Sequence, residues 1–183
     1  PYANYFLAPN YKINEMTAAV LLSQLDKLDG YIHSKIRSAR TIIDGVSDLG
    51  VLTPQRVRPG DRHTYWVLSF TIATDRLDCS AFDFSDAVSA EGIPFSGPYI
   101  GSGREGPLYR NPFLVKPDLY GNSRFPLDYG RNAAIDYEQV RCPNGETIMG
   151  RGINLLMRPS FNDRDIDDVI RALRKVAGHY LAG

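Results

Sequence analysis

Apolar residues recur three or four positions apart from residue 14 to about residue 48, which is the repeat of an amphipathic helix. The pattern predicts one long helix with a continuous buried stripe, started by the side-chain oxygen of Asn14 and ended near Gly50. A helix of about 35 residues is about 50 Å long, so we expect it to connect two bodies, or a body and a partner. The apolar positions are Leu21, Leu25, Leu28, Ile32, Ile36, Ala39, Ile43 and Val46.

Gly30 lies inside this helical pattern. Glycine is less favourable than alanine inside a helix by about 1 kcal/mol, because its backbone loses more freedom on folding. A glycine at this position therefore predicts a bend, or the close approach of another element.

Strands and helices alternate along the rest of the chain. Residues 64–72 are rich in aromatic and β-branched side chains, which predicts a central strand. A helix is predicted at 79–91 with a short extended piece after it, and a second strand at 153–157. The last helix is predicted after Asn162, whose spacing to Asp165 is that of a capping box.

A long segment at 96–128 separates the two strands and is crowded with Gly, Pro, Tyr and Asn. Loops of this length are usually functional or disordered, and the aromatic residues argue against disorder. A short helix is predicted to follow at 131–140. The order of long helix, strand, helix, loop, short helix, strand and helix predicts an α+β fold with helices packed on a short sheet.

Composition excludes several classes of partner. The chain has 183 residues, and 43% of them are hydrophobic, which is enough for the core of one domain with a small appendage. Lys+Arg and Asp+Glu both number 21, so no overall field attracts nucleic acid or an anionic membrane. No apolar run reaches the roughly 18 residues of a membrane span, and no leader opens the sequence. We expect neither a nucleic-acid nor a membrane partner.

Cys79 and Cys142 lie far apart in the sequence and have no second cysteine nearby. They are too few for a disulfide scaffold or a cysteine-rich zinc site. Two free thiols are typical of a reducing compartment, so we expect a cytoplasmic protein. No two histidines have the spacing of a metal site on a helix, and no metal is expected.

The most specific motif lies at residues 10–28, which read NYKINEMTAAVLLSQLDKL. It resembles the N-Y-R-M-x-E-x-x-A-A-x-x-x-x-Q-L-x-K-L helix of the DegT/StrS-type sugar aminotransferases, which are pyridoxal-phosphate (PLP) enzymes. Weaker motifs resemble the same family in the same order: EGIP at 91–94, GPLYRNP at 106–112 and CPNGE at 142–146. The last helix also resembles the final helix of the family.

The resemblance implies the small C-terminal domain of a fold-type I PLP aminotransferase. Residues 1–50 would then be the end of the large domain and the inter-domain helix, and residues 51–183 the small domain. In the family, the cofactor-bearing lysine precedes this helix in an S-x-x-K context. We expect that lysine N-terminal to this sequence, and the chain alone to be inactive, because none of its own lysines has that context: Lys12, Lys27, Lys35, Lys116 and Lys175.

The resemblance also implies cofactor contacts. Asn10 would reach the PLP phosphate of the neighbouring subunit in a homodimer, with Lys12 beside it. Many family members have arginine where Lys12 stands, and lysine keeps the charge but loses the two-pronged fork of donors. Asn10 is also a common type of turn residue after a proline, and this alternative stays open.

Four residues of the long loop are candidates for substrate contacts: Tyr99, Arg104, Tyr109 and Arg110. Aromatic rings and guanidinium groups suit sugar hydroxyls, carboxylates or nucleotide diphosphates, and the family uses the equivalent region to shape the substrate mouth. The alternative is that the tyrosines pack the loop while the arginines face water. The GSGREG run at 101–106 matches a dinucleotide-binding pattern, but Pro107 prevents the helix that such a site requires.

Two functions therefore stand at this point. The first is a PLP-dependent aminotransferase that transfers an amino group from glutamate or glutamine to a keto-sugar, expected to be nucleotide-linked, or to a keto-cyclitol. The second is a non-catalytic dimerisation or interaction domain, because the long amphipathic helix would suit association without any cofactor.

Overall fold

The computed structural model describes residues 11–97, 107–116, 125, 129–130 and 135–181. The described residues fall into two compact units. The larger unit contains residues 13–97 and 150–181, and the smaller unit contains the described residues among 1–12 and 99–149.

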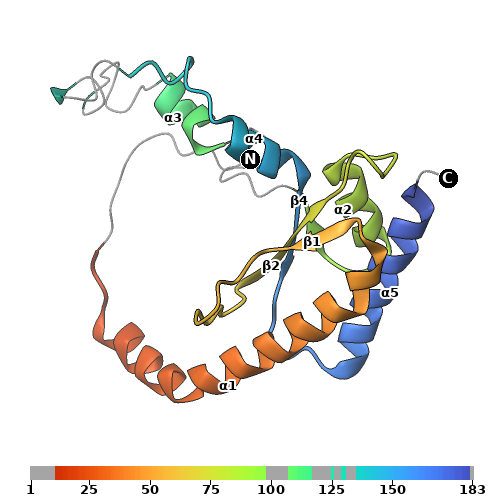
Figure 1. Ribbon diagram of the computed structural model, residues 1–183. Helices are drawn as coiled ribbons and strands as arrows, with labels where there is room; N and C mark the ends of the chain where they lie inside the picture. The colour runs from red at the N-terminus through yellow and green to blue at the C-terminus, as the bar shows by residue number, and fades with distance from the viewer. Residues whose placement is uncertain (1–10, 98–106, 117–124, 126–128, 131–134, 182–183) are drawn as a thin grey trace. The chain divides into compact units, whose positions relative to one another are not determined.

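The larger unit is built on a four-stranded antiparallel sheet with the order β1-β2-β4-β3 (Figure 1). The strands are β1 (Leu52–Pro54), β2 (Val67–Ile72), β3 (Phe95–Ser96) and β4 (Gly152–Leu156). The central strands pair from Val67 opposite Leu156 to Thr71 opposite Gly152. Alternate residues of β2 and β4 are buried, which is the pattern of a sheet with one face on the core.

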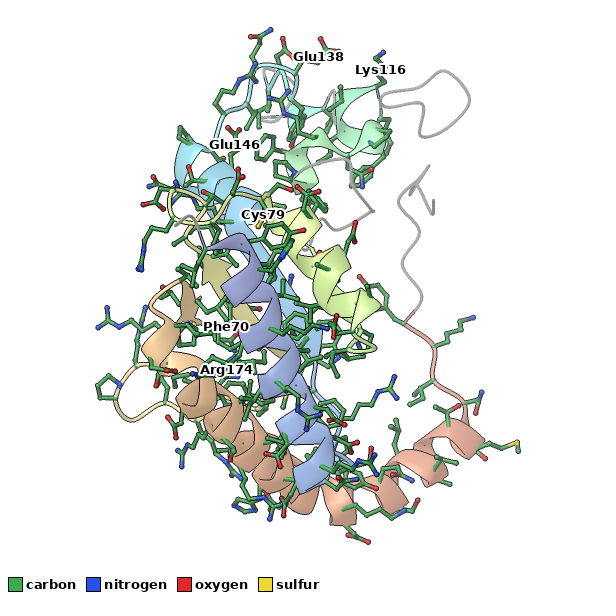
Figure 2. The ribbon with its side chains drawn as sticks, turned by 90° about the vertical axis from the view of Figure 1, so that its right-hand side faces the viewer. Phe70, Cys79, Lys116, Glu138, Glu146 and Arg174 are labelled. Atoms are coloured by element: carbon green, nitrogen blue, oxygen red, sulfur yellow. The ribbon has the colours of Figure 1, made fainter. Side chains whose placement is uncertain are left out.

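Three helices supply the other side of this core: α1 (Glu15–Val46), α2 (Ala81–Ala90) and α5 (Asp163–Tyr180). Phe70 of the central strand, labelled in Figure 2, is 1% exposed. Ile42 of α1, Phe84 of α2 and Leu173 of α5 belong to the same buried cluster. The expected α+β fold, with helices packed on a short sheet and a long N-terminal helix, is confirmed.

Side-chain caps fix where the helices begin. The Thr17 N–H donates to Asn14 Oδ1 at 2.8 Å, so the predicted start of α1 is confirmed. Asn162 and Asp165 form the predicted capping box of α5, in which each side chain accepts from a backbone N–H of the other residue. Such caps satisfy N–H groups that have no partner within the helix.

Burial along α1 differs from the prediction. Ala39, Ile42 and Val46 are at most 1% exposed, whereas Leu21 and Leu25 are 50% and 60% exposed. The continuous buried stripe is therefore wrong for the first half of the helix. The reason is that the sheet and α5 cover only its C-terminal half.

Of the two alternatives expected at Gly30, a bend or a close approach, the close approach lies at Gly45 instead. A Cβ atom built on Gly30 has no described heavy atom within 4 Å, whereas one built on Gly45 would lie 2.6 Å from Ile170 Cδ1 of α5. Arg174, labelled on α5 in Figure 2, also donates to the Gly45 carbonyl at 2.9 Å. Gly45 lets the backbone of α1 pack directly on α5.

The first central strand starts three residues later than predicted. Tyr65 has a φ of +47°, in the left-handed region that strands do not use, so pairing begins only at Val67. The short strand β1 was not predicted. It follows Gly50, whose φ of +64° allows the sharp turn that ends the helical segment.

The short helix predicted at 131–140 is wrong over its described part, 135–140, which contains only turns and irregular backbone. The helix lies further on, as α4 (Pro143–Arg151). Proline is favoured at a first helical position because its missing N–H would have no partner there.

Candidate functional site

The described candidates for substrate contact lie on a tight turn of the smaller unit. Tyr109 and Arg110 belong to the 3₁₀ turn η2 (Leu108–Arg110), and the four-residue helix α3 (Pro112–Val115) follows. Asn111, only 2% exposed, joins them by accepting the Phe113 N–H on its side-chain oxygen at 3.3 Å. Residues 107–116 therefore form an ordered turn.

A glutamate of α4 holds this turn. The Tyr109 hydroxyl donates to Glu146 Oε1, although the two residues are 37 positions apart. The same oxygen accepts the backbone N–H of Cys142 at 3.3 Å. Glu146, labelled in Figure 2, thus joins η2 to the start of α4.

Two arginines converge beside this contact. Arg110 Nη1 donates to the carbonyl oxygen of Glu138 at 3.2 Å, and Arg141 Nη1 donates to the same oxygen at 2.8 Å. The guanidinium carbon of Arg110 also lies 5.6 Å from the centre of the Tyr109 ring, within the range of a cation–π contact. Arg110 is therefore anchored at two places rather than free in water.

The contacts set the charges of the tyrosine and the glutamate. Burial raises the pKa of Tyr109 above its ordinary value, and its hydrogen bond to Glu146 raises it further. The hydrogen bond from Tyr109 is the largest cause that lowers the pKa of Glu146, and the hydrogen bond from the Cys142 N–H lowers it further. The positive charges of Arg110 and Arg141 also lower this pKa. At neutral pH the pair consists of a neutral phenol donating to a carboxylate.

Among the predicted cofactor residues, only Lys12 is described. It is exposed and lies two residues before Asn14, the cap of α1. Asn10, Tyr99 and Arg104 lie outside the described residues, so the roles expected for them stay predictions, as do those of Lys12, Tyr109 and Arg110.

No lysine of the chain is buried: Lys35 is half-buried, and Lys12, Lys27, Lys116 and Lys175 are exposed. The ammonium of Lys175 lies 2.7 and 2.8 Å from the two carboxylate oxygens of Glu91. In the part of the chain that the structure describes, no three His, Cys, Asp or Glu side chains are grouped so as to hold a metal ion. None of the described helices is long and apolar enough to cross a membrane.

Sequence reasoning missed the residues that organise this site. Glu146 was noticed only as the last letter of the CPNGE motif and received no role, and Arg141 and Glu138 were not singled out. A glutamate in the first turn of a helix that begins with Pro143 was the available signal, because acidic side chains are favoured at helix N-termini. Its pairing with Tyr109 is a tertiary contact that no local pattern reveals.

The fold is similar to part of the fold of several solved enzymes. Helicobacter pylori PseC, an aminotransferase involved in the biosynthesis of pseudoaminic acid, matches with a TM-score of 0.70 and 15% identity, over 95% of this chain and 40% of PseC. Escherichia coli GDP-4-keto-6-deoxy-D-mannose-3-dehydratase, solved with bound hydrated PLP, matches with a TM-score of 0.63 and 20% identity, over 92% of this chain and 38% of the enzyme. These likenesses concern the fold alone.

The family follows from the sequence. The profile of the DegT/DnrJ/EryC1/StrS aminotransferase family matches residues 1–125, and the chain belongs to that family, as the motif at 10–28 predicts. L-glutamine:scyllo-inosose aminotransferase of Streptomyces griseus is 29% identical over 177 residues, covering 93% of this chain and 39% of that enzyme. The chain thus spans well under half the length of the relatives that it matches.

Proposed function

We propose that this chain acts as the small-domain part of a PLP-dependent aminotransferase, which transfers an amino group from glutamate or glutamine to a keto-sugar, nucleotide-linked, or to a keto-cyclitol. The observation that carries the proposal is the family match over residues 1–125. The relative from Streptomyces griseus supports the cyclitol alternative and glutamine as donor, because its name states both.

On the cofactor side, Asn10 and Lys12 hold the phosphate of PLP bound by the neighbouring subunit of a homodimer. An amide N–H and an ammonium are both donors to phosphate oxygens, and Lys12 is exposed. When bound, PLP supplies the electron sink for the exchange of the amino group. We place the reactive lysine outside this sequence, because none of its five lysines stands in the S-x-x-K context of the family.

On the substrate side, Tyr99, Arg104, Tyr109 and Arg110 face the amino-group acceptor. Tyr109 keeps its proton at neutral pH because its pKa is raised, and its hydroxyl donates to Glu146, so it orients the turn. Arg110 is held by its contacts with Tyr109 and Glu138, and its planar guanidinium suits hydroxyl groups, carboxylates or phosphates. The anchored turn presents these groups with little freedom left to lose on binding.

The test is an amino-transfer assay on the protein at its natural length, loaded with PLP. Glutamine and glutamate are each offered as donor, with scyllo-inosose and nucleotide-linked keto-sugars as acceptors, and the amino product is measured by mass spectrometry. We expect product from at least one pair, and a lower kcat/KM for Arg110→Gln than for Arg164→Gln, an exposed arginine of α5. Absence of product from every pair would count against the proposal.

A second candidate function is supported by the exposed face of α1. Leu21, Leu25 and Leu28 lie on one face of α1 and are 50%, 60% and 47% exposed. An exposed apolar face of this kind normally marks an interaction surface. Under this candidate the chain is a non-catalytic dimerisation or interaction domain. The two candidates separate in the assay above, because only the aminotransferase yields product. A cytoplasmic location is proposed for both, on the basis of the free thiols of Cys79 and Cys142.

A further inference from the structure

A hollow of about 570 Å³ lies at the edge of the sheet in the larger unit. Ile93, Leu156, Phe161 and Val169 provide its apolar walls, and the charged side chains of Arg158, Asp165 and Asp168 reach it. Small-molecule sites have volumes of roughly 300–1,000 Å³ and combine apolar walls with a few polar groups. The size and the lining both fall within that description.

The hollow follows from the sequence of the edge strand. β3 pairs with β4 only through Phe95 opposite Leu155 and Ser96 opposite Asn154. The next pair would place Pro94 opposite Leu156, and proline has no N–H for the ladder, so the pairing stops there. Gly92, with a φ of +92°, allows the sharp turn between the end of α2 and the start of β3. The end of β4 is therefore left open beside the first turns of α5.

The charges around the hollow are of both signs. Arg158 follows β4 and makes no ion pair within the part of the chain that the structure describes. Asp165 uses one carboxylate oxygen on the Asn162 N–H at 3.0 Å, in the capping box of α5. Asp168 Oδ1 lies 3.2 Å from Arg171 Nη1, and both side chains are exposed to water. A cation thus stands at the end of β4, and two carboxylates stand on α5.

We propose that this hollow binds a compact zwitterion. Its ammonium group lies toward Asp165 and Asp168, its carboxylate or phosphate lies toward Arg158, and its carbon chain or ring rests on the apolar walls. Charge-assisted hydrogen bonds are the strong ones in proteins, and a ligand that carries both charges leaves neither side of the hollow unmatched. Apolar α-amino acids and amino-sugar phosphates share this chemistry. The site is independent of the proposed function, which assigns nothing to these residues.

Two matched series of probes test the charge requirement on the 183-residue chain by ligand-observed NMR. The first series is L-phenylalanine, phenethylamine without the carboxylate, and 3-phenylpropionate without the ammonium. The second is glucosamine 6-phosphate, glucosamine and glucose 6-phosphate. We expect the zwitterion of one series to bind with a Kd on the order of 1 mM, and its two analogues to bind at least about tenfold more weakly. The series that binds identifies the source of the ligand.

Variants locate the site. Arg158→Gln and Asp168→Asn are each expected to weaken binding by roughly tenfold, the size of a lost charge-assisted contact. Arg164→Gln and Asp167→Asn are matched controls, because both residues are exposed, lie on α5 and do not line the hollow. Far-UV circular dichroism of each variant checks that the fold is kept.

Amide chemical shifts give a second measurement that needs no variant. Titration with the bound zwitterion is expected to move the resonances of residues 92–96 and 156–169 more than those of the rest of the larger unit. Three results would each overturn the proposal: no zwitterion of either series binds, an analogue with a single charge binds as well as its zwitterion, or the shifts fall outside these residues. Since none of these experiments involves PLP or amino transfer, their failure leaves the proposed function standing.

Discussion

Gly45→Ala probes the contact between α1 and α5 that holds the larger unit together. The added Cβ atom would lie 2.6 Å from Ile170 Cδ1, 3.0 Å from Cγ1 and 3.1 Å from Cγ2. Isoleucine is stiff at χ1, so these atoms cannot all turn away without moving the helix. The substitution therefore forces either α5 or the Ile170 side chain out of its place.

The expected magnitude is a balance of two effects. Alanine instead of glycine in a helix interior stabilises by about 0.5–1 kcal/mol. Overpacking a close contact destabilises by about 1–3 kcal/mol. We therefore expect Gly45→Ala to lower the free energy of unfolding by about 1 kcal/mol. Gly30→Ala is the matched control on the same helix, since no described atom lies within 4 Å of its added Cβ, and it should raise that free energy by about 0.5–1 kcal/mol.

Urea unfolding, followed by circular dichroism at a fixed temperature, measures both variants. Ile170→Val removes Cδ1, the nearest atom, so the double variant Gly45→Ala, Ile170→Val should be more stable than the sum of the single effects predicts. If Gly45→Ala stabilises the chain as much as Gly30→Ala does, the close approach of the two helices does not exist in solution. The account of the core would then be wrong at this contact.

Three further predictions concern caps, charges and association. Ser80→Ala removes the capping box of α2 and should cost about 1 kcal/mol in the same unfolding assay; an unchanged midpoint would contradict the cap. Because the pKa of Tyr109 is raised, its contribution to stability is complete at neutral pH and is lost as the pH rises through the pKa of the folded state. Because the pKa of Glu146 is lowered, its contribution is lost as the pH falls through the pKa of the folded state. An ultraviolet titration should accordingly show one late-ionising tyrosine that is absent in Tyr109→Phe and ionises earlier in Glu146→Gln; identical curves for all three would refute the contact. Analytical ultracentrifugation should show a dimer, and Leu25→Asp should raise its dissociation constant at least roughly tenfold, because Leu25 is an exposed apolar residue of α1. A wild-type chain that stays monomeric at high concentration would contradict this prediction.

Local signals in the sequence were sufficient for much of the fold. Asn14 and Asn162 cap the helices they were expected to cap, because a cap depends only on residues within one turn. The pattern could not reveal which half of α1 is covered, since apolar spacing is the same whether or not a partner element reaches it. Leu25 is 60% exposed, whereas Ile42 is fully buried on the same helix.

The site was predicted less well than the fold. Tyr109 and Arg110 were selected for their chemistry, and the structure shows both in one 3₁₀ turn. Glu146 was missed because its partner lies 37 residues away. The helix α4 was missed because Gly145 and Gly150 weaken the helical pattern.

The central claim is that residues at the start of this chain hold the phosphate of a PLP-dependent enzyme. The most direct test is the dissociation constant of PLP for the protein at its natural length, measured for wild type, Asn10→Ala and Lys27→Ala. The account predicts that Asn10→Ala raises this constant at least about tenfold, and that Lys27→Ala, a change at an exposed lysine of α1, leaves it unaltered. Equal dissociation constants for all three proteins, or a wild type that does not bind PLP, would contradict the account.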